Sequence, residues 1–316
     1  MKTIYVNLKM SESLALIIFL SICLLPVSAR AEENPKLWSA EKLQARLAEP
    51  NLVVVDTRNA LSYRKSHIKG AIHLDTGCSG PLVHQVGEVP CSLRQPDELI
   101  AELKKNGICP DRNIVVYGDH NSWGAEGRLF WILEKLGFTK LALLDGGYDR
   151  WRHQSGSTGA LFANHKEPCP ASAMNHLSAA GLKQANLNAS TLWPLYQKGN
   201  LIFLDVRTKA EFDGVILYRE QRGGHLPEAL HLDWETLWND DYTLKSRAEL
   251  LTLLTEIGLP QPEQSEKKLI VPYCTGGIRS GFAWFVLRRL GYPAVENYDN
   301  GFWEWASTPE LPVHQR

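Results

Sequence analysis

The sequence has little of what marks a nucleic-acid-binding or metal-binding protein. Lys and Arg together number 34 and Asp and Glu 35, which leaves a formal net charge of -1. No run of five or six like charges forms the basic tail that attracts phosphate backbones. No Cys-x-x-Cys or His-x-x-x-His pair gives metal-ligand spacing either, so we expect no nucleic-acid partner, no metal and no cofactor.

Long apolar runs are also missing, apart from residues 14–27 (LALIIFLSICLLPV). This run is shorter than the roughly 18 residues or more that a spanning helix needs. Ala29-Arg30-Ala31 has the small-x-small pattern of a cleavage site. We therefore predict a signal peptide over residues 1–31, cleaved after Ala31, and a periplasmic or secreted protein without a membrane span. An uncleaved anchor and a lipoprotein processed at Cys23 are the alternatives.

Cysteine is scarce, with six in the whole chain and five after the predicted cleavage. An odd number in an oxidising compartment leaves at least one thiol unpaired or paired between chains. Cys78 and Cys91 flank a loop with Gly and Pro and are the best candidates for a local disulfide, and Cys109 with Cys169 is a second candidate pair. The pairing among these four stays open at this point.

The sequence contains an internal repeat, which is present as three pairs of segments in the same order. Their spacing differs little, with offsets of 149 from Asp56 to Asp205, 156 from Gly118 to Cys274, and 154 from Asp145 to Asp299. The paired segments are LVVVDTRNALSYRKSHIKGAIHL with LIFLDVRTKAEFDG and GGHLPEALHL, NIVVYGDHNSWGAEGRLFWILEKLGF with KLIVPYCTGGIRSGFAWFVLRRLGY, and LALLDGGYDRW with VENYDNGFWEW. We infer a duplicated domain.

Each copy alternates short β-branched runs with stretches of helical apolar spacing. Strands that are apolar throughout and joined by helices predict an α/β fold with a parallel sheet covered on both faces. The segment near residues 153–175 is rich in Gly, Ser, Pro and Ala and predicts a junction. We expect one domain over 36–153, a linker over 154–176 and a second domain over 177–316.

The candidate active residue is Cys274, at the end of the apolar run LIVPY and just before a helical pattern. Ligands of such sheets bind beyond the carboxyl ends of the strands. Gly276 and Gly277 let the backbone curl so that N–H groups converge on a negative sulfur. The helix N-terminus and Arg279 add positive charge. Together these effects favour the nucleophilic thiolate form. The alternative, a small structural cysteine, would not need the glycine pair or the arginine.

These motifs identify the chain as similar to the tandem-domain rhodaneses, a family of sulfurtransferases. The resemblance extends over both halves through DTR and DVR, HIKGA and HLPEA, LDGGYDRW and YDNGFWEW, and the cysteine loop. It implies that each domain is a five-stranded, mainly parallel sheet with flanking helices, and that only the second domain is catalytic. The sequence agrees with this, because Gly118 occupies the position of Cys274 in the first copy.

The resemblance implies sulfur transfer through a Cys274 persulfide, from a donor to a thiol or cyanide acceptor. We expect the N–H groups of the loop to hold the persulfide and Arg279 to stabilise the anionic donor or the loop. The loop residues in question are Thr275, Gly276, Gly277, Ile278, Arg279 and Ser280. A persulfide relay or binding protein supplied by a partner protein is the alternative. Cysteine phosphatase or arsenate reductase chemistry is disfavoured, because that loop is Cys-x5-Arg and this one is Cys-x4-Arg.

The donor is less well defined by the sequence. Thiosulfate-type members resemble one another in a basic residue just after the cysteine, and mercaptopyruvate-type members in a Gly-Val-Thr ending; CTGGIRS has neither. Thiosulfate is our leading expectation and 3-mercaptopyruvate the second. A substrate-binding arginine of the family would fall near Glu211, where none is present. Arg219 and Arg222 are candidate replacements, although surface-exposed charges are the more common explanation for such residues.

Several polar and aromatic residues have ordinary structural explanations. We interpret Asp56, Arg58, Asp205 and Arg207 as scaffold, because strand-end carboxylates accept backbone N–H bonds and pair with arginine. His67 and His225 begin equivalent turns in both copies, which also indicates a structural role. Trp303 is a candidate aromatic wall beside Cys274. Trp123 and Arg128, in the loop of the first copy that lacks cysteine, are candidates to line the cleft.

Overall fold

The computed structural model describes residues 36–154, 156, 158–159, 168–265 and 267–315. The predicted signal peptide over residues 1–31 lies outside this part of the chain. Among the helices within these ranges, none combines the length and the apolar character required to cross a membrane.

The first copy folds around a sheet of five parallel strands in the order β1-β8-β7-β2-β4. A hairpin of β5 and β6 and a short antiparallel pair of β3 and β9 accompany it. The elements are β1 (Lys36–Trp38), α1 (Ala40–Arg46), β2 (Leu52–Asp56), α2 (Ala60–Lys65), β3 (His67–Ile68), β4 (Ile72–His73), β5 (Val83–Val86), β6 (Val89–Leu93), α3 (Pro96–Lys105), β7 (Asn113–Tyr117), a 3-10 turn (His120–Ser122), α4 (Ala125–Leu136), β8 (Leu141–Leu144), α5 (Gly147–His153) and β9 (Thr158–Gly159).

The second copy also alternates strands and helices along the chain, but its sheet is smaller. Its elements are α6 (Ala171–Met174), α7 (Ala179–Ala185), α8 (Ala189–Gln197), β10 (Leu201–Asp205), α9 (Lys209–Asp213), β11 (Leu230–His231), a 3-10 turn (Trp234–Leu237), α10 (Arg247–Glu256), a 3-10 turn (Pro262–Gln264), β12 (Leu269–Tyr273), α11 (Ile278–Leu290) and α12 (Gly301–Ala306). The three strands are parallel in the order β11-β10-β12.

The expectation of five strands in each sheet is met in the first copy and is wrong for the second. Where the first sheet has β8, the second copy has two isolated parallel bridges, from Ile270 to Val295 and from Tyr273 to Tyr298. The counterpart of β1 falls at residues 185–187, where α7 ends, and is not a strand.

Both sheets are buried on both faces, as predicted from their apolar strands. In β2, Val53 and Val55 face one core cluster and Val54 faces another, since side chains alternate along a strand. In β10, Leu204 likewise faces one core cluster and Phe203 faces another. The parallel-sheet interpretation of the sequence is confirmed.

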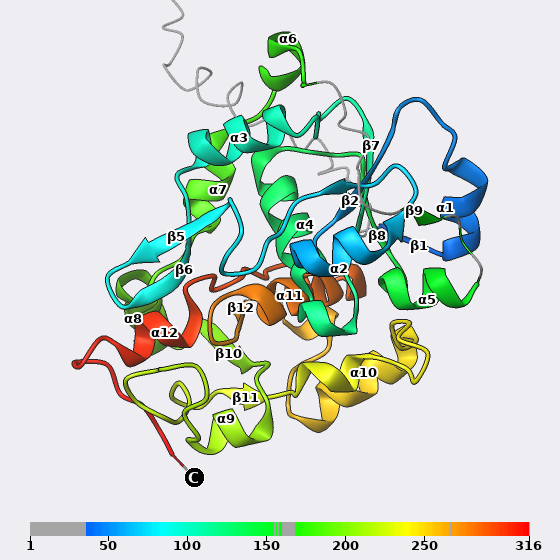
Figure 1. The fold of residues 1–316 in the computed structure, drawn as a ribbon. Coiled ribbons are helices and arrows are strands. Elements are labelled where there is room, and N and C mark those ends of the chain that lie inside the picture. Colours follow the sequence, from blue (N-terminus) through cyan, green and yellow to red (C-terminus); the bar gives the residue numbers. More distant parts are fainter. Residues whose placement is uncertain (1–35, 155, 157, 160–167, 266, 316) are drawn as a thin grey trace, which may run out of the picture. The chain divides into compact units, whose positions relative to one another are not determined.

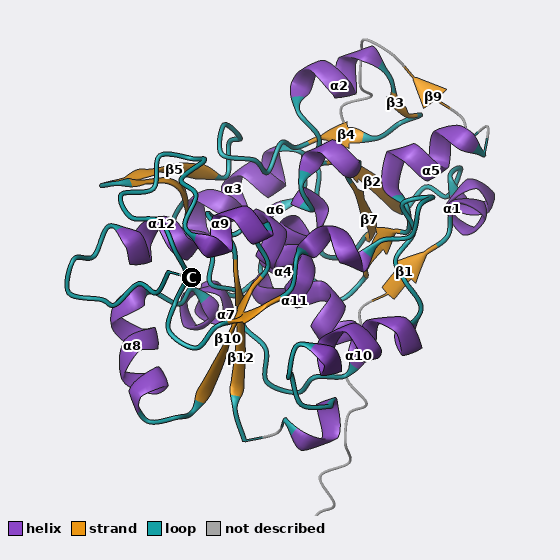
Figure 2. Ribbon diagram, turned by 90° about the horizontal axis from the view of Figure 1, so that it is seen from below, coloured by secondary structure: helices purple, strands orange, loops and turns teal. Residues whose placement is uncertain are grey.

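The two copies share one core, formed around α4 and α11. These two helices pack against each other (Figure 1) and are buried nearly all round. Gly127 and Gly281 make the approach possible, because a Cβ at Gly127 would lie 2.3 Å from Phe282 Cα and one at Gly281 would lie 2.7 Å from Arg128 Cα. The rings of Phe130 and Phe285 meet edge to face across the same contact. Figure 2 shows the strands of each copy beside this central pair of helices.

Two disulfides join the predicted cysteine pairs. Cys78 is bonded to Cys91, and Cys109 is bonded to Cys169. Both pairings expected from the sequence are therefore confirmed. The second bond joins Cys109, in the loop after α3, to Cys169, which lies within the segment predicted as the linker.

Candidate functional site

The candidate nucleophile Cys274 lies directly after β12 and before α11, as the sequence predicts. Its side chain is buried, and it is the free cysteine of the part of the chain that the structure describes. Gly277 precedes α11 with a positive φ of 82°, so the backbone curls there before the helix begins. The first N–H groups of α11 have no partner within the helix and point toward the start of this turn.

The cysteine loop packs against the start of α12 and the residues just before it. Phe302 N donates to Cys274 O at 2.8 Å, and Trp303 N donates to Thr275 O at 3.0 Å. A Cβ at Gly276 would lie 2.2 Å from the Trp303 ring, and one at Gly277 would lie 2.3 Å from Asp299 O. Both glycines are therefore required by close packing. The candidate aromatic wall, Trp303, contacts the loop at Gly276.

Arg279 is turned toward a carboxylate and away from solvent. Its guanidinium makes two hydrogen bonds to Glu211, at 2.7 and 2.8 Å, and one to Thr275 Oγ1 at 2.9 Å. Thr275 Oγ1 also donates to Glu211 at 2.8 Å. Burial alone would raise the pKa of Glu211, but the hydrogen bonds and charge of Arg279 outweigh it and lower that pKa to about 2. Of the two roles expected for Arg279, this geometry favours stabilising the loop.

Two aromatic side chains lie over the Arg279 guanidinium. The rings of Trp123 and Tyr218 are 5.7 and 5.9 Å from it and 5.4 Å from each other, edge to face. Trp123 comes from the first copy and Tyr218 from the second. Burial and the nearby charge of Glu211 raise the pKa of Tyr218. Trp123 therefore reaches the edge of the site, as proposed from the sequence.

The two arginines of the YREQR segment have different surroundings. Arg222 donates to four carbonyl oxygens within and after α12, those of Trp305, Ala306, Thr308 and Leu311. It therefore closes the end of that helix, and the hypothesis that it replaces a substrate-binding arginine is not supported. Arg219 is exposed and has a positive φ of 65°.

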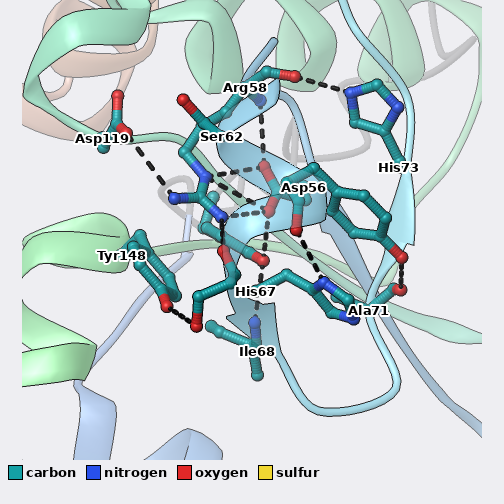
Figure 3. A network of polar contacts seen from close by, with 12 residues as sticks. Asp56, Arg58, Ser62, His67, Ile68, Ala71, His73, Asp119 and Tyr148 are labelled. Atoms are coloured by element: carbon teal, nitrogen blue, oxygen red, sulfur yellow. Dashed lines mark hydrogen bonds and ion pairs between the residues drawn. The ribbon is translucent and has the colours of Figure 1, made fainter. Parts of the chain in front are cut away.

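The strand-end acid–arginine pairs form the same network in both copies. Figure 3 shows the first one, in which Arg58 donates hydrogen bonds to the Asp56 carboxylate. Tyr117 Oη donates to the same carboxylate. In the second copy Arg207 holds Asp205 and Tyr273 Oη donates to it at 2.6 Å. Because the network is equally complete in the copy without a thiol, it fits the scaffold interpretation.

In the first copy a carboxyl group fills the space that a cysteine would need. A Cβ at Gly118 would lie 2.2 Å from Glu126 Oε2 and 2.5 Å from Ser122 Oγ. Burial raises the pKa of Glu126 to about 8, and its Oε2 has no hydrogen-bond partner. The group lines a small pocket with Asp119, His120, Trp234, Trp238 and Tyr242.

Sequence reasoning missed the importance of Glu211 and Tyr218. The Thr208-x-x-Glu211 spacing is a capping-box signal, and the structure contains that box at the start of α9. That signal explains a helix start but not a bond to Arg279, 68 residues further along the chain. Tyr218 lies in an insertion without a counterpart in the first copy, so the repeat gave no information on it. Within the described ranges no group of three or more His, Cys, Asp or Glu side chains is placed to hold a metal.

Comparisons with known proteins agree with this arrangement. Residues 39–154 and 188–308 each match the family described as "Rhodanese-like domain". A thiosulfate sulfurtransferase of Corynebacterium glutamicum is 31% identical over 290 residues, covering 88% of this chain and 90% of that protein. A thiosulfate sulfurtransferase of Azotobacter vinelandii is 29% identical over 281 residues, covering 88% and 97%.

Solved structures show the same fold at lower identity. Wild-type EanB superposes with a TM-score of 0.76 at 23% identity, covering 89% of this chain and 69% of that chain. The crystal structure of YnjE gives a TM-score of 0.71 at 23% identity, and this chain spans 63% of its length.

Proposed function

The chain belongs to the rhodanese family, and from that premise we propose that it moves a sulfane sulfur from a donor to a thiol or cyanide acceptor through a persulfide on Cys274. The names of the relatives support a rhodanese-type sulfurtransferase. The observation that carries the proposal is the unpaired thiol of Cys274, buried at the turn between β12 and α11 with a curled backbone around it.

The reaction proceeds in two displacements. The Cys274 thiolate attacks the outer sulfur of thiosulfate, the sulfur–sulfur bond of the donor breaks, and sulfite leaves with the electron pair. Cyanide or an acceptor thiolate then attacks the outer sulfur of the persulfide, and Cys274 leaves as a thiolate. The N–H groups from Thr275 to Ser280 and the positive end of α11 stabilise the negative sulfur in both steps.

Thiosulfate is the first donor to test, since both relatives described above are named for it. Because Arg279 is paired with Glu211, the oxyanion of the donor has to be held mainly by backbone N–H groups. That arrangement also suits 3-mercaptopyruvate, whose carboxylate makes the same demand. The two disulfides favour an oxidising compartment, in line with the proposed export to the periplasm or beyond.

A relay that receives sulfur from a partner protein is the second candidate. It is favoured by three consecutive exposed aliphatic residues, Val215, Ile216 and Leu217, which are 49–51% exposed and immediately precede Tyr218. A contiguous group of exposed apolar residues is typical of a protein contact, and this group leads into Tyr218, whose ring lies 5.9 Å from the Arg279 guanidinium.

Intact mass of the purified protein before and after thiosulfate, and again after cyanide, tests the proposal. We expect the mass of one sulfur atom to be gained and then removed by cyanide, with thiocyanate formed over many cycles. Cys274→Ser should gain nothing. Uptake of one sulfur without turnover would support the relay, whereas no uptake by wild-type protein with an alkylatable Cys274 would rule out thiosulfate as donor.

A further inference from the structure

A buried arginine joins the Cys78–Cys91 disulfide to the segment beneath the active cysteine. Arg128 and Asp299 are both fully buried, and the guanidinium makes hydrogen bonds to the carboxylate at 2.6 and 2.8 Å. The same guanidinium donates to Cys91 O at 2.8 Å and approaches Cys91 Sγ at 3.2 Å. Arg128 comes from the first copy and Asp299 from the second, so this contact crosses between the copies.

Asp299 lies directly against the cysteine loop. Its carbonyl oxygen would be 2.3 Å from a Cβ at Gly277, and the neighbouring Asn297 donates to Gly277 O at 3.3 Å. Phe302, three residues further on, holds Cys274 O. The position of the residues around Asp299 therefore sets the position of the loop.

The two sulfurs of this disulfide have different surroundings. Cys78 is exposed, whereas Cys91 is buried and is the sulfur that Arg128 contacts. An attacking thiolate therefore reaches Cys78, and the leaving sulfur is Cys91. A cation beside a leaving thiolate stabilises it and speeds thiol–disulfide exchange.

We propose that Cys78–Cys91 is a thiol-exchanging disulfide whose opening is transmitted through Arg128 and Asp299 and lowers sulfur transfer at Cys274. The exchange itself rests on the geometry at Cys91. Its effect on activity rests on the function proposed above.

The reductant is a small thiol, and the step balances with two of them. The first thiolate bonds to Cys78 Sγ, the Cys78–Cys91 bond breaks, and Cys91 leaves as a thiolate beside Arg128. The second thiolate attacks the mixed disulfide and releases Cys78 together with an oxidised thiol dimer. The new Cys91 anion then competes with Asp299 for the Arg128 guanidinium, which weakens the support of the loop. Acceptor thiols of the sulfur-transfer reaction are reductants of this class.

The Cys109–Cys169 bond is the matched control within the same chain, because both of its sulfurs belong to buried residues packed with Met174. The oxidised protein is incubated with dithiothreitol for increasing times, quenched with iodoacetamide, digested and analysed by mass. We expect Cys78 and Cys91 to be alkylated at least about 10-fold faster than Cys109 and Cys169. Equal rates would overturn the exchange.

An Arg128→Lys variant tests the role of the cation. The shorter and differently shaped ammonium cannot reach Asp299 and Cys91 together, so opening of the Cys78–Cys91 bond should slow several-fold while the Cys109–Cys169 rate stays unchanged. An unchanged Cys78–Cys91 rate in a folded variant would show that Arg128 does not assist the leaving sulfur.

The effect of the open disulfide on sulfur transfer at Cys274 is measured after dithiothreitol has been removed, with thiosulfate and cyanide as substrates. Opening should lower thiocyanate production at least about 3-fold, and reoxidation should restore it. This fall and recovery of activity should persist in the double variant Cys109→Ser/Cys169→Ser. It should be absent from the double variant Cys78→Ser/Cys91→Ser. Full activity with the bond open would overturn the coupling. Absence of turnover in the oxidised protein with both thiosulfate and 3-mercaptopyruvate as donors would overturn the proposed function and the coupling with it, while the alkylation rates still decide the exchange at Cys78.

Discussion

At the scale of single residues, the carboxylate of Glu211 is the main support of the cysteine loop. It accepts hydrogen bonds from Thr208, Thr275 and Arg279 and is itself fully buried. Breaking a buried ion pair leaves an uncompensated charge, which costs about 3–5 kcal/mol. The same change moves the loop, and a misplacement of about 1 Å can cost roughly 100-fold in rate.

We therefore expect Glu211→Gln to lower both stability and turnover. The free energy of unfolding should fall by about 3 kcal/mol, and thiocyanate formation should fall roughly 10- to 100-fold. Denaturant unfolding and initial rates measure the two effects. In the double variant Glu211→Gln/Arg279→Met much of the stability should return, because no buried charge is left alone. Independent, additive losses would contradict the pairing.

Glu126 leads to a prediction about pH. Its pKa is raised by burial to about 8, from an ordinary value of 4.5. Between these values the folded protein holds a proton that the unfolded chain has lost, so this residue lowers stability as pH rises through that window. Glu126→Gln cannot ionise. It should match wild type near pH 5 and be more stable by about 4 kcal/mol near pH 9.

Denaturant titrations at several pH values test this, with Glu88→Gln as the control because Glu88 is exposed. The difference between Glu126→Gln and wild type should grow with pH, while that of the control stays near zero. Parallel curves for all three proteins would show that Glu126 is ionised without cost in the folded state.

At the scale of elements, the strand–turn–helix units could be predicted because their signals are local. The run LIVPY, the glycine pair and the helical spacing of FAWFVLRRLGY all fall within one short stretch, and β12, its turn and α11 follow that order. The contacts of Arg279, Arg222 and Tyr218 could not be predicted, since each is fixed by residues far away in the sequence. Strand length also escaped prediction where pairing decides it, as in the reduced fourth strand of the second sheet.

The turn between β7 and α4 differs from the turn between β12 and α11. A cysteine placed at Gly118 should therefore not accept sulfur as Cys274 is proposed to do. Gly118→Cys, made in a Cys274→Ser background so that it carries the test thiol, would place Cβ within 2.2 Å of Glu126 Oε2. We expect no sulfur uptake from thiosulfate by intact mass, and a loss of stability of about 1–3 kcal/mol from overpacking. Adding Glu126→Ala should recover much of that stability. Efficient loading of the single exchange would mean that the carboxyl group does not block the site.

At the scale of the whole described chain, the two copies form a common core. Leu129 and Phe130 of the first copy and Phe282 and Phe285 of the second belong to the same buried cluster. Domains joined by small polar interfaces move and unfold separately, but a shared apolar core opposes this. The buried Arg128–Asp299 ion pair adds a contact between the copies. Removing only one of its two charges destabilises the fold, because the other charge is left buried without a partner.

We therefore predict one cooperative unfolding transition for both copies. Hydrogen exchange of amides in β2 and in β10, followed at increasing denaturant, should report the same free energy of opening and the same midpoint. Asp299→Asn should lower both midpoints together, since the charge it leaves on Arg128 lies between the copies. Separate transitions, or an Asp299→Asn effect confined to β10, would show that each copy is stable on its own.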